Sequence, residues 1–542
     1  MILEQHIIDA ALNDIENQYK IVDAPIFFSA LSDNNWKTEF YNKLKALRKN
    51  VFENEERIVV VQDVNDQYHY EDSSCSPGEM LVFLQQTLQE IDITNFFVLI
   101  VSPNPEIGNE IDTLYQEWSS DETKIQYYKV NGDYKKEIVK QDTFCVLPWM
   151  HFFLSTNGDV LPCCVSDKNL PIGNINKFSL EEIFNGEQIK KIRTNMMNNQ
   201  KSLECKNCYY EEEQRGLKSK RQITNEKWKK NIPEFLQKTD MHGQISKIDI
   251  LEFHLGLNSV CNLMCRTCSG FSSTRLALEE KKLFNHSKNY KQILTLKEKN
   301  NIVERVSPHI KTAKEIIFAG GEPTIQDEHY KILDQLIENK QQHTINLRYN
   351  LNFTTTKFKN KSIIDYWSKF SNIVVNASLD GHGKKFEYIR HGAKWKEVQK
   401  NFKKIKLRCP HILLEVNSVI SFLSIESVLE LYRVWHDTGI LSINNFKIGL
   451  MVENSGFFDI QSLPKHHKKR LSKKIDEHCM WLKFKNNTKL LNDWLSVKEY
   501  MNFSDKTYLL SETKKDCEIR DKSRGVNFYK TFPELADVFD LD

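Results

Sequence analysis

The chain has 542 residues, of which 40% are hydrophobic and 27% are charged, a composition typical of globular proteins rather than of disordered or collagen-like chains. Lys and Arg (75) nearly balance Asp and Glu (73), so the molecule has no strong field to attract nucleic acid or an anionic membrane surface. The longest unbroken apolar run is the six residues Phe96 to Val101, far below the ~20 residues that span a bilayer. We therefore expect no membrane and no specific nucleic acid among its partners.

The N-terminus and the cysteines bear on the cellular compartment. An acidic residue, Glu4, stands where a secretory signal carries basic residues, so we expect a cytoplasmic protein. Cytosolic thiols are kept reduced, so the twelve cysteines are not expected to form disulfides. Most of them fall into two tight groups, whereas Cys75, Cys409, Cys479 and Cys517 stand alone and are expected to be small buried hydrophobic residues.

Residues 1–140 carry β-prone apolar runs separated by helix-like stretches such as Glu79–Glu90. Strands that alternate with helices predict an N-terminal α/β domain with a parallel sheet. No glycine-rich phosphate loop follows any of these runs, so we assign the domain no chemistry. The four predicted strands are Ile26–Phe28, Ile58–Val61, Phe96–Val101 and Ile125–Val130.

Residues 141–225 form a cysteine-containing module. Ser179-Leu-Glu-Glu182 precedes Ile183 and Phe184, and a Ser followed three residues later by Glu is the capping box that starts a helix. The dipeptide Asn157-Gly158 between apolar runs predicts the tight turn of a hairpin. These features indicate a small module whose cysteines hold a metal group.

Residues 240–455 alternate about six times between strand and helix patterns, which predicts a partial (β/α)6 barrel within an overall α/β fold. The tail, residues 456–542, is rich in lysine and helical in pattern. The expected strands are Ile245–Leu255, Glu315–Ala319, Thr344–Phe353, Ile373–Leu379, Ile412–Ile420 and Phe446–Met451. The expected helices are Ser272–Phe284, Glu328–Asn339, Ser362–Phe370, Trp395–Lys406 and Ile425–Thr438.

A cysteine triplet, Cys261-x3-Cys265-x2-Cys268, follows the first expected barrel strand. Three thiolates can hold three irons of a cubane cluster and leave the fourth iron open to bind a small molecule. Taken alone, the triplet also fits a zinc site completed by His254. A structural zinc site does not require a barrel around it, so the strands that follow favour the cluster.

The next expected strand ends in Gly320-Gly321-Glu322-Pro323. Together the triplet and this sequence resemble the signature and the GGEP motif of the radical S-adenosylmethionine (SAM) superfamily. The resemblance implies that SAM chelates the open iron and that Glu322 accepts from its ammonium group. It further implies contacts to ribose, carboxylate or substrate from Asn352, Ser378, Asp380 and Asn417. Thr267 departs from the family, in which an aromatic residue often precedes the third cysteine.

The second group of cysteines has the spacing C-x12-G-x4-C followed by C-x2-C. It resembles the twitch module, the short form of the SPASM domain, which implies a second, auxiliary 4Fe-4S cluster. In better-known relatives this module follows the barrel, whereas here it precedes it. A zinc ribbon is the alternative for such a set, and Cys164 is an alternative ligand to Cys163. The predicted ligands are Cys145, Cys163, Cys205 and Cys208.

The resemblance implies an enzyme that reductively cleaves SAM to a 5'-deoxyadenosyl radical, which abstracts hydrogen from a substrate. The substrate class stays open between a peptide and a small molecule. We expect a net oxidation aided by the auxiliary cluster, and an electron donor such as flavodoxin or ferredoxin. The alternative is a non-catalytic metal-binding scaffold that binds a partner protein. For a general base, His382, Asp380 and Lys384 are equally placed by sequence.

Overall fold

The computed structural model describes four N-terminal strands and most of the chain from residue 143 onward. Contacts between Cα atoms divide the chain into two compact units. The described residues are 26–29, 57–62, 96–102, 124–129, 143–215, 218–240, 242–284, 302–450 and 457–540. Unit 1 comprises Met1–Val146, Lys191–Leu203 and Cys208–Ser246, and unit 2 comprises Leu147–Lys190, Glu204–Asn207 and Lys247–Asp542.

Unit 1 contains a four-stranded parallel sheet with the order β1-β2-β3-β4. All four strands lie on the apolar runs predicted from the sequence. The helix expected at Glu79–Glu90 falls outside the described residues. The strands are β1 (Ile26–Ser29), β2 (Arg57–Gln62), β3 (Phe96–Ser102) and β4 (Lys124–Lys129), and two helices near the end of the unit are α10 (Lys220–Trp228) and α11 (Ile232–Gln237).

Unit 2 is built on a nine-stranded sheet with the order β17-β16-β14-β11-β10-β8-β5-β6-β7. Six strands, from β8 to β17, are parallel and follow one another in chain order, which confirms the α/β class and a large parallel sheet. Closure of this sheet into a barrel stays a prediction. The six strands are β8 (Glu252–Gly256), β10 (Glu315–Ala319), β11 (Asn346–Leu351), β14 (Asn372–Ser378), β16 (Leu413–Ile420) and β17 (Phe446–Leu450).

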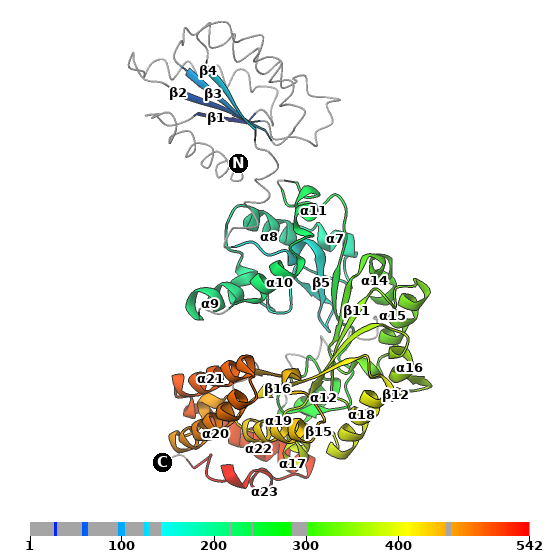
Figure 1. Ribbon diagram of the computed structural model, residues 1–542, viewed down its shortest axis with the longest axis vertical. Helices are drawn as coiled ribbons and strands as arrows, with labels where there is room; N and C mark the ends of the chain where they lie inside the picture. The colour runs from blue at the N-terminus through cyan, green and yellow to red at the C-terminus, as the bar shows by residue number, and fades with distance from the viewer. Residues whose placement is uncertain are drawn as a thin grey trace. The chain divides into compact units, whose positions relative to one another are not determined.

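Helices between these strands cover one face of the sheet (Figure 1). In β11 and β14, alternate side chains are buried. The Tyr349 ring of β11 lies 5.2 Å from the Trp367 ring and 5.5 Å from the His329 ring, centroid to centroid. The opposite face keeps polar side chains such as Asn350 and Asn376. The helices are α12 (Thr274–Phe284), α15 (Asp327–Glu338), α16 (Ile363–Trp367), α18 (Trp395–Arg408) and α19 (Ile425–Asp437).

The cysteine module contributes a hairpin to this sheet. Strands β5 (His151–Leu154) and β6 (Asp159–Leu161) are antiparallel, and β5 runs parallel to β8. Gly158 in the turn has φ +88°, a left-handed conformation that glycine adopts without steric cost. The predicted hairpin is therefore confirmed. The two-residue strand β7 (Gly173–Asn174) pairs with β6 at the sheet edge.

The predicted capping box is also confirmed, at the start of helix α7 (Leu180–Phe184). The Ser179 side chain accepts from the Glu182 backbone N–H at 3.1 Å. In return the Glu182 carboxylate accepts from the Ser179 backbone N–H at 2.7 Å. Two backbone donors that the helix leaves without intrahelical partners are satisfied in this way.

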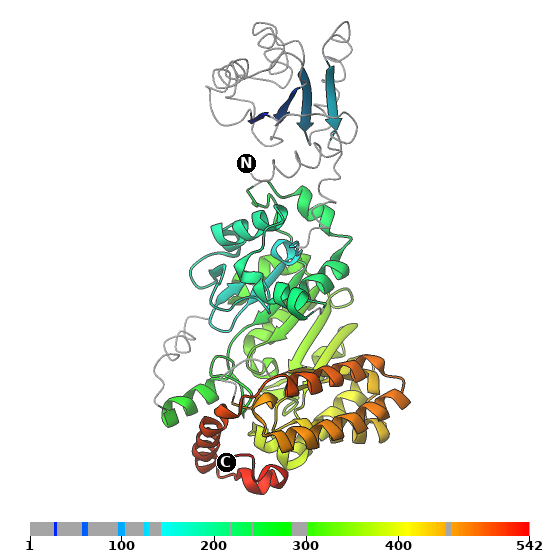
Figure 2. The same cartoon turned by 90° about the vertical axis from the view of Figure 1, so that its left-hand side faces the viewer.

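The C-terminal tail is helical, as the sequence predicted. Figure 2 shows two long helices of this segment, α20 (Lys465–Phe484) and α21 (Thr488–Phe503), side by side in orange. They are followed by α22 (Leu510–Arg524) and α23 (Phe528–Thr531). Within the part of the chain that the structure describes, no helix combines the length and apolar character that crossing a membrane requires.

The isolated cysteines lie in the core. Cys409, Cys479 and Cys517 are 1%, 8% and 2% exposed, which confirms them as buried residues. Cys75 falls outside the described residues.

Candidate functional site

The cysteine triplet occupies the loop between β8 and α12, at the carboxyl end of the first parallel strand. Cys261 follows β8, and Cys265 lies in the two-residue strand β9 (Met264–Cys265). β9 pairs with β15 (Arg390–His391), so that Cys265 stands opposite Arg390. The Cys268 N–H donates to the Cys265 carbonyl oxygen at 3.3 Å, and this turn brings the second and third cysteines together.

The three thiols share one electrostatic environment, in which Cys265 is buried and Cys261 and Cys268 are half-buried. Burial raises the pKa of Cys261 and Cys268 to about 12, and raises that of Cys265. Cys265 also raises the pKa values of Cys261 and Cys268, and Cys261 raises that of Cys268, while the Arg390 guanidinium lowers the pKa of all three. Thiolates in such a place require compensating positive charge, which bound iron and a neighbouring cation supply.

Arg390 is a residue of this site that sequence reasoning missed. Its Nη2 lies 2.8 Å from an Asp380 carboxylate oxygen, and its Nη1 donates to Cys265 Sγ at 3.9 Å. Its Nε is buried, and no acceptor among the described residues lies within hydrogen-bonding distance of it. The sequence carries no spacing signal for Arg390, because its position depends on the pairing of β15 with β9.

The glycine pair after β10 lies directly against the cysteine loop. Gly320 and Gly321 have φ +76° and +56°. A Cβ atom on Gly321 would lie 2.3 Å from the Val260 carbonyl oxygen, and a Cβ atom on Gly320 would lie 2.6 Å from Thr156 Cγ2. The Glu322 N–H donates to the same Val260 oxygen at 2.9 Å. Glycine is therefore required here by both conformation and close backbone approach.

Glu322 places a buried carboxylate next to this contact. It is 1% exposed and accepts from the Thr324 hydroxyl at 2.6 Å and from the Asn352 N–H at 2.8 Å. Burial raises its pKa, and these hydrogen bonds oppose the rise. The Asn352 side chain donates to the Asn262 side-chain oxygen at 2.9 Å and lies 4.0 Å from Cys261 Sγ. Glu322 and Asn352 thus lie at the first cysteine.

The other predicted cofactor-binding residues form a second group, on β14 and β16. Ser378 and Asn417 stand opposite each other in the two strands, and among the described hydrogen bonds neither side chain reaches the cysteine loop. Asp380 is 0% exposed and accepts from the Val419 N–H at 2.8 Å. Through its pair with Arg390, Asp380 is connected to the cysteines.

Two of the predicted auxiliary ligands, Cys145 and Cys208, lie in unit 1 and are each 7% exposed. The backbone of Arg221 and the hydroxyl of Ser219 form hydrogen bonds to Cys208 that oppose the rise of its pKa on burial. Arg221 also interacts electrostatically with Cys145, and its guanidinium is held by Glu212 at 3.0 Å. Arg221 thus contacts Cys208 through its backbone and Cys145 through its charge, and it is a second residue that the sequence did not reveal.

The remaining auxiliary candidates lie in unit 2. Cys163 and Cys164 follow β6, and Cys205 ends the 3₁₀ helix η1 (Leu203–Cys205). The turn after Cys164 is joined to the Cys205 segment by a hydrogen bond from the Asp167 N–H to the Glu204 carbonyl oxygen at 3.0 Å. A Lys206–Asp167 ion pair at 2.5 Å and an Asn207–Val165 hydrogen bond at 2.8 Å add to this connection.

Two family models match the chain. Residues 257–432 match the radical SAM superfamily, and residues 145–209 match the SPASM iron-sulfur cluster-binding domain. No curated protein matches the chain at a significant level.

Among solved structures, the chain resembles His6-tagged anSMEcpe with bound AdoMet, at 17% identity and a TM-score of 0.30, over 44% of this chain and 60% of that one. It also resembles Streptococcus suis SuiB bound to precursor peptide SuiA, at 17% identity and a TM-score of 0.29, over 48% and 52% of the two chains. SuiB bound to S-adenosylmethionine matches at 15% identity and a TM-score of 0.29, over 56% and 61%. The matched region thus covers less than two thirds of each of these proteins.

The donor set fits the cofactors that these domains imply. A radical SAM domain implies a 4Fe-4S cluster and SAM, and an SPASM domain implies auxiliary iron-sulfur clusters. Three thiols from one loop offer ligands for three irons. Beside them lies the Arg390 guanidinium, whose Nε has no hydrogen-bond partner among the described residues and suits an anionic group. The chain therefore contains a radical SAM domain, preceded by an SPASM-type iron-sulfur domain.

Proposed function

We propose that this protein is a radical SAM enzyme whose catalytic cluster is held by Cys261, Cys265 and Cys268. The observation that carries the proposal is their placement on one loop, with the buried Glu322 and the largely buried Arg390 beside them. When bound, the cluster and SAM would supply a 5'-deoxyadenosyl radical able to abstract hydrogen from a substrate C–H bond.

The protein's own residues would orient and shield the reactants. Glu322 has lone pairs beyond its three hydrogen bonds and would accept from the ammonium group of SAM. Arg390 would offset the negative charge of the thiolates. Asn352, Ser378, Asp380 and Asn417 would serve the ribose, the carboxylate or the substrate, with Asp380 acting through Arg390. Gly320 and Gly321 would keep the GGEP motif close to the cysteine loop.

The three candidates for a general base are each paired. Asp380 is paired with Arg390, His382 lies 2.9 Å from a Glu430 carboxylate oxygen, and Lys384 lies 3.1 Å from one of Glu387. Lys384 is also 88% exposed. None of the three is singled out by its environment, and the proposal includes no protein base.

The reaction we propose is a net oxidation of a peptide or a small molecule. The four cysteines Cys145, Cys163, Cys205 and Cys208 would hold an auxiliary cluster that accepts the electron lost by the substrate radical, and a flavodoxin or ferredoxin would supply the separate electron that cleaves SAM. With no open iron, such a cluster suits electron transfer. One substrate-derived product per 5'-deoxyadenosine would support this reaction, whereas regeneration of intact SAM would contradict it.

The experiment that tests the proposal is anaerobic reconstitution followed by addition of SAM and dithionite, with 5'-deoxyadenosine quantified. The variant Cys261→Ala/Cys265→Ala/Cys268→Ala should form none. Cys409→Ala is the matched control, because it removes a buried cysteine that donates to the Ile364 carbonyl oxygen at 3.7 Å, far along the chain from the cysteine triplet, and it should behave as wild type. A fully iron-loaded wild type that forms no 5'-deoxyadenosine would instead support a non-catalytic scaffold.

A further inference from the structure

We infer that helix α22 of the C-terminal segment holds the cysteine loop in the shape that binds the catalytic cluster, with Arg266 as the positioning residue. The inference rests on the proposed function in that this loop carries the cluster. Arg266 stands in the chain between Cys265 and Cys268. The radical SAM match ends at residue 432, so neither family model assigns a role to α22.

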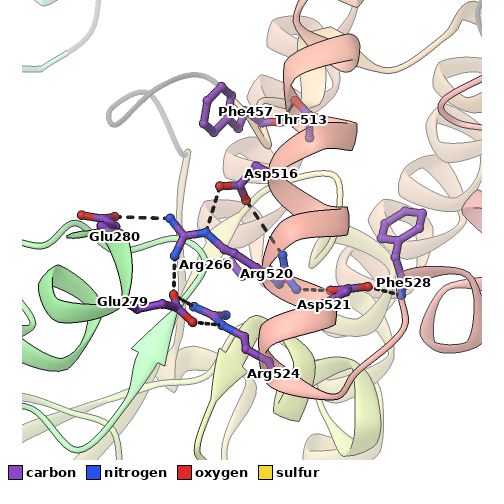
Figure 3. A network of polar contacts seen from close by, with 10 residues as sticks. All are labelled: Arg266, Glu279, Glu280, Phe457, Thr513, Asp516, Arg520, Asp521, Arg524 and Phe528. Carbon is purple, nitrogen blue, oxygen red and sulfur yellow. Dashed lines mark hydrogen bonds and ion pairs between the residues drawn. The ribbon is translucent and has the colours of Figure 1, made fainter. Parts of the chain in front are cut away.

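The Arg266 side chain is fully buried and reaches α22 through two carboxylates (Figure 3). Its Nη2 pairs with Asp521, and its Nη1 lies 3.9 Å from an Asp516 carboxylate oxygen. The guanidinium also lies over the Tyr388 ring, 4.0 Å from the centroid. The Arg266 backbone N–H donates to the Ile389 carbonyl oxygen at 2.8 Å. A buried guanidinium requires opposite charge nearby, so these contacts fix the loop between two of its cysteines.

A second set of ion pairs ties α22 to α12, the helix into which the cysteine loop runs. Glu279 of α12 accepts from Arg524 Nε at 2.7 Å and Nη2 at 2.6 Å, a bidentate pair, and from Arg520 Nη1 at 2.5 Å. Although burial opposes the change, these guanidinium groups hold the pKa of Glu279 below its ordinary value. Both the middle of the cysteine loop and helix α12, which follows the loop, are therefore anchored to α22 (Figure 3).

Asp521 also fixes the end of α22 itself. Its second carboxylate oxygen accepts from the Phe528 N–H at 2.6 Å, at the start of α23. Gly525, with φ +65°, ends α22 in the left-handed conformation common at helix C-termini. One carboxylate thus joins Arg266, α22 and α23, and its removal should loosen the loop without removing any predicted iron ligand.

The test uses anaerobically reconstituted full-length protein with Asp521→Asn. We expect iron release to a chelator to be about tenfold faster than in wild type, the change that about 1.4 kcal/mol produces. The change that SAM induces in the EPR spectrum of the reduced cluster should also be lost. Asp521→Glu, which keeps the charge, should restore most of both properties.

The matched control is Asp476→Asn. Asp476 lies in the same C-terminal segment and pairs with Lys498 of α21 at 2.6 and 2.8 Å, away from the cysteine loop. We expect it to release iron at the wild-type rate and to keep the response to SAM. Faster release in this control, equal to that of Asp521→Asn, would overturn the inference.

The double variant Arg266→Met/Asp521→Asn separates positioning from general destabilisation. Removing both charges removes the cost of a buried Arg266 guanidinium that has lost the nearer of its two carboxylates, so the melting temperature should recover relative to Asp521→Asn while iron release stays fast. Wild-type iron release in both variants would overturn the inference. If wild type binds iron but shows no response to SAM, the proposed function fails, and the iron-release rates still decide the role of α22.

Discussion

Arg390 and Asp380 place two opposite charges in the interior beside the cysteines. The Asp380 side chain is 0% exposed and that of Arg390 is 11% exposed. Each charge is stabilised mainly by the other, since removing one partner of a buried pair leaves the other charge uncompensated. The Arg390–Asp380 pair therefore links the stability of the fold to the electrostatics of the cysteine loop.

This pair makes a prediction for Arg390→Gln. We expect the iron-free variant to lose roughly 3–5 kcal/mol of unfolding free energy, because Asp380 stays buried without its counter-charge. Adding Asp380→Asn should recover part of the loss. Urea denaturation at neutral pH checks both values. Equal stability of Arg390→Gln and wild type would show that the pair does not stabilise the fold.

A buried histidine predicts a pH dependence of stability. His329 is 0% exposed, between Phe318 and Tyr349, and burial lowers its pKa to about 3. The unfolded chain takes up a proton near pH 6.5, whereas the folded chain does not. The contribution of His329 to stability is therefore fully present above pH 6.5 and is lost as the pH falls toward 3.

The variant His329→Gln removes this proton uptake. Relative to the variant, wild type should lose about 1.4 kcal/mol of unfolding free energy between pH 7.5 and pH 5.5. Urea midpoints of the two proteins at both pH values measure the difference, and any effect of acid on the clusters is common to both. Parallel pH profiles would contradict the assignment of a neutral His329.

Sequence reasoning found residues whose chemistry depends on local spacing. The cysteine triplet and Glu322 lie in short motifs, so their ligand types and order in the chain were sufficient to predict them. Arg390 and Arg266 could not be found in this way. Their roles depend on the pairing of β15 with β9 and on the contact with α22, and both are contacts between segments far apart in sequence.

At the level of elements, the glycine turn after β10 predicts a steric effect on the cysteine loop. Gly321→Ala would bring a Cβ atom to 2.3 Å from the Val260 carbonyl oxygen, whereas at Gly439, with φ +67°, a Cβ atom meets nothing within 4 Å. Both substitutions force Ala into a left-handed conformation at a cost of about 1–2 kcal/mol. Only Gly321→Ala should also displace the loop.

Iron content after reconstitution and urea denaturation distinguish the two glycine variants. We expect Gly321→Ala to bind less iron than wild type and to be less stable than Gly439→Ala. The latter should bind iron normally. If both variants bound iron equally well, the contact between the GGEP motif and the cysteine loop would not control cluster binding.

The first and last residues of most helices and strands could be predicted closely from the sequence, and the exceptions have physical reasons. β10 has the predicted limits because the apolar run of residues 316–319 is bounded by the charged Glu315 on one side and by Gly320 and Gly321 on the other. β8 begins at Glu252, later than predicted, because Ile245 pairs with Thr239 in an isolated bridge. The hairpin of the cysteine module was predicted, but its pairing with β8 was not, since strand partners far apart in sequence leave no local pattern.

For the whole molecule, we propose that one chain holds two iron-sulfur clusters with separate ligand sets, and that only the Cys261, Cys265 and Cys268 set binds SAM. The SPASM and radical SAM matches support two clusters. In an SPASM-type set of four thiolates no iron is left open, whereas the triplet leaves one open. The two clusters should therefore respond differently to SAM.

The most direct measurement is iron content together with EPR of the dithionite-reduced protein, with and without SAM, for wild type and for Cys261→Ala/Cys265→Ala/Cys268→Ala. We predict that the variant keeps about half of the wild-type iron, as expected when one of two 4Fe-4S clusters is lost. We also predict that its spectrum no longer changes with SAM. A variant that keeps all of its iron, or whose spectrum still responds to SAM, would contradict the account.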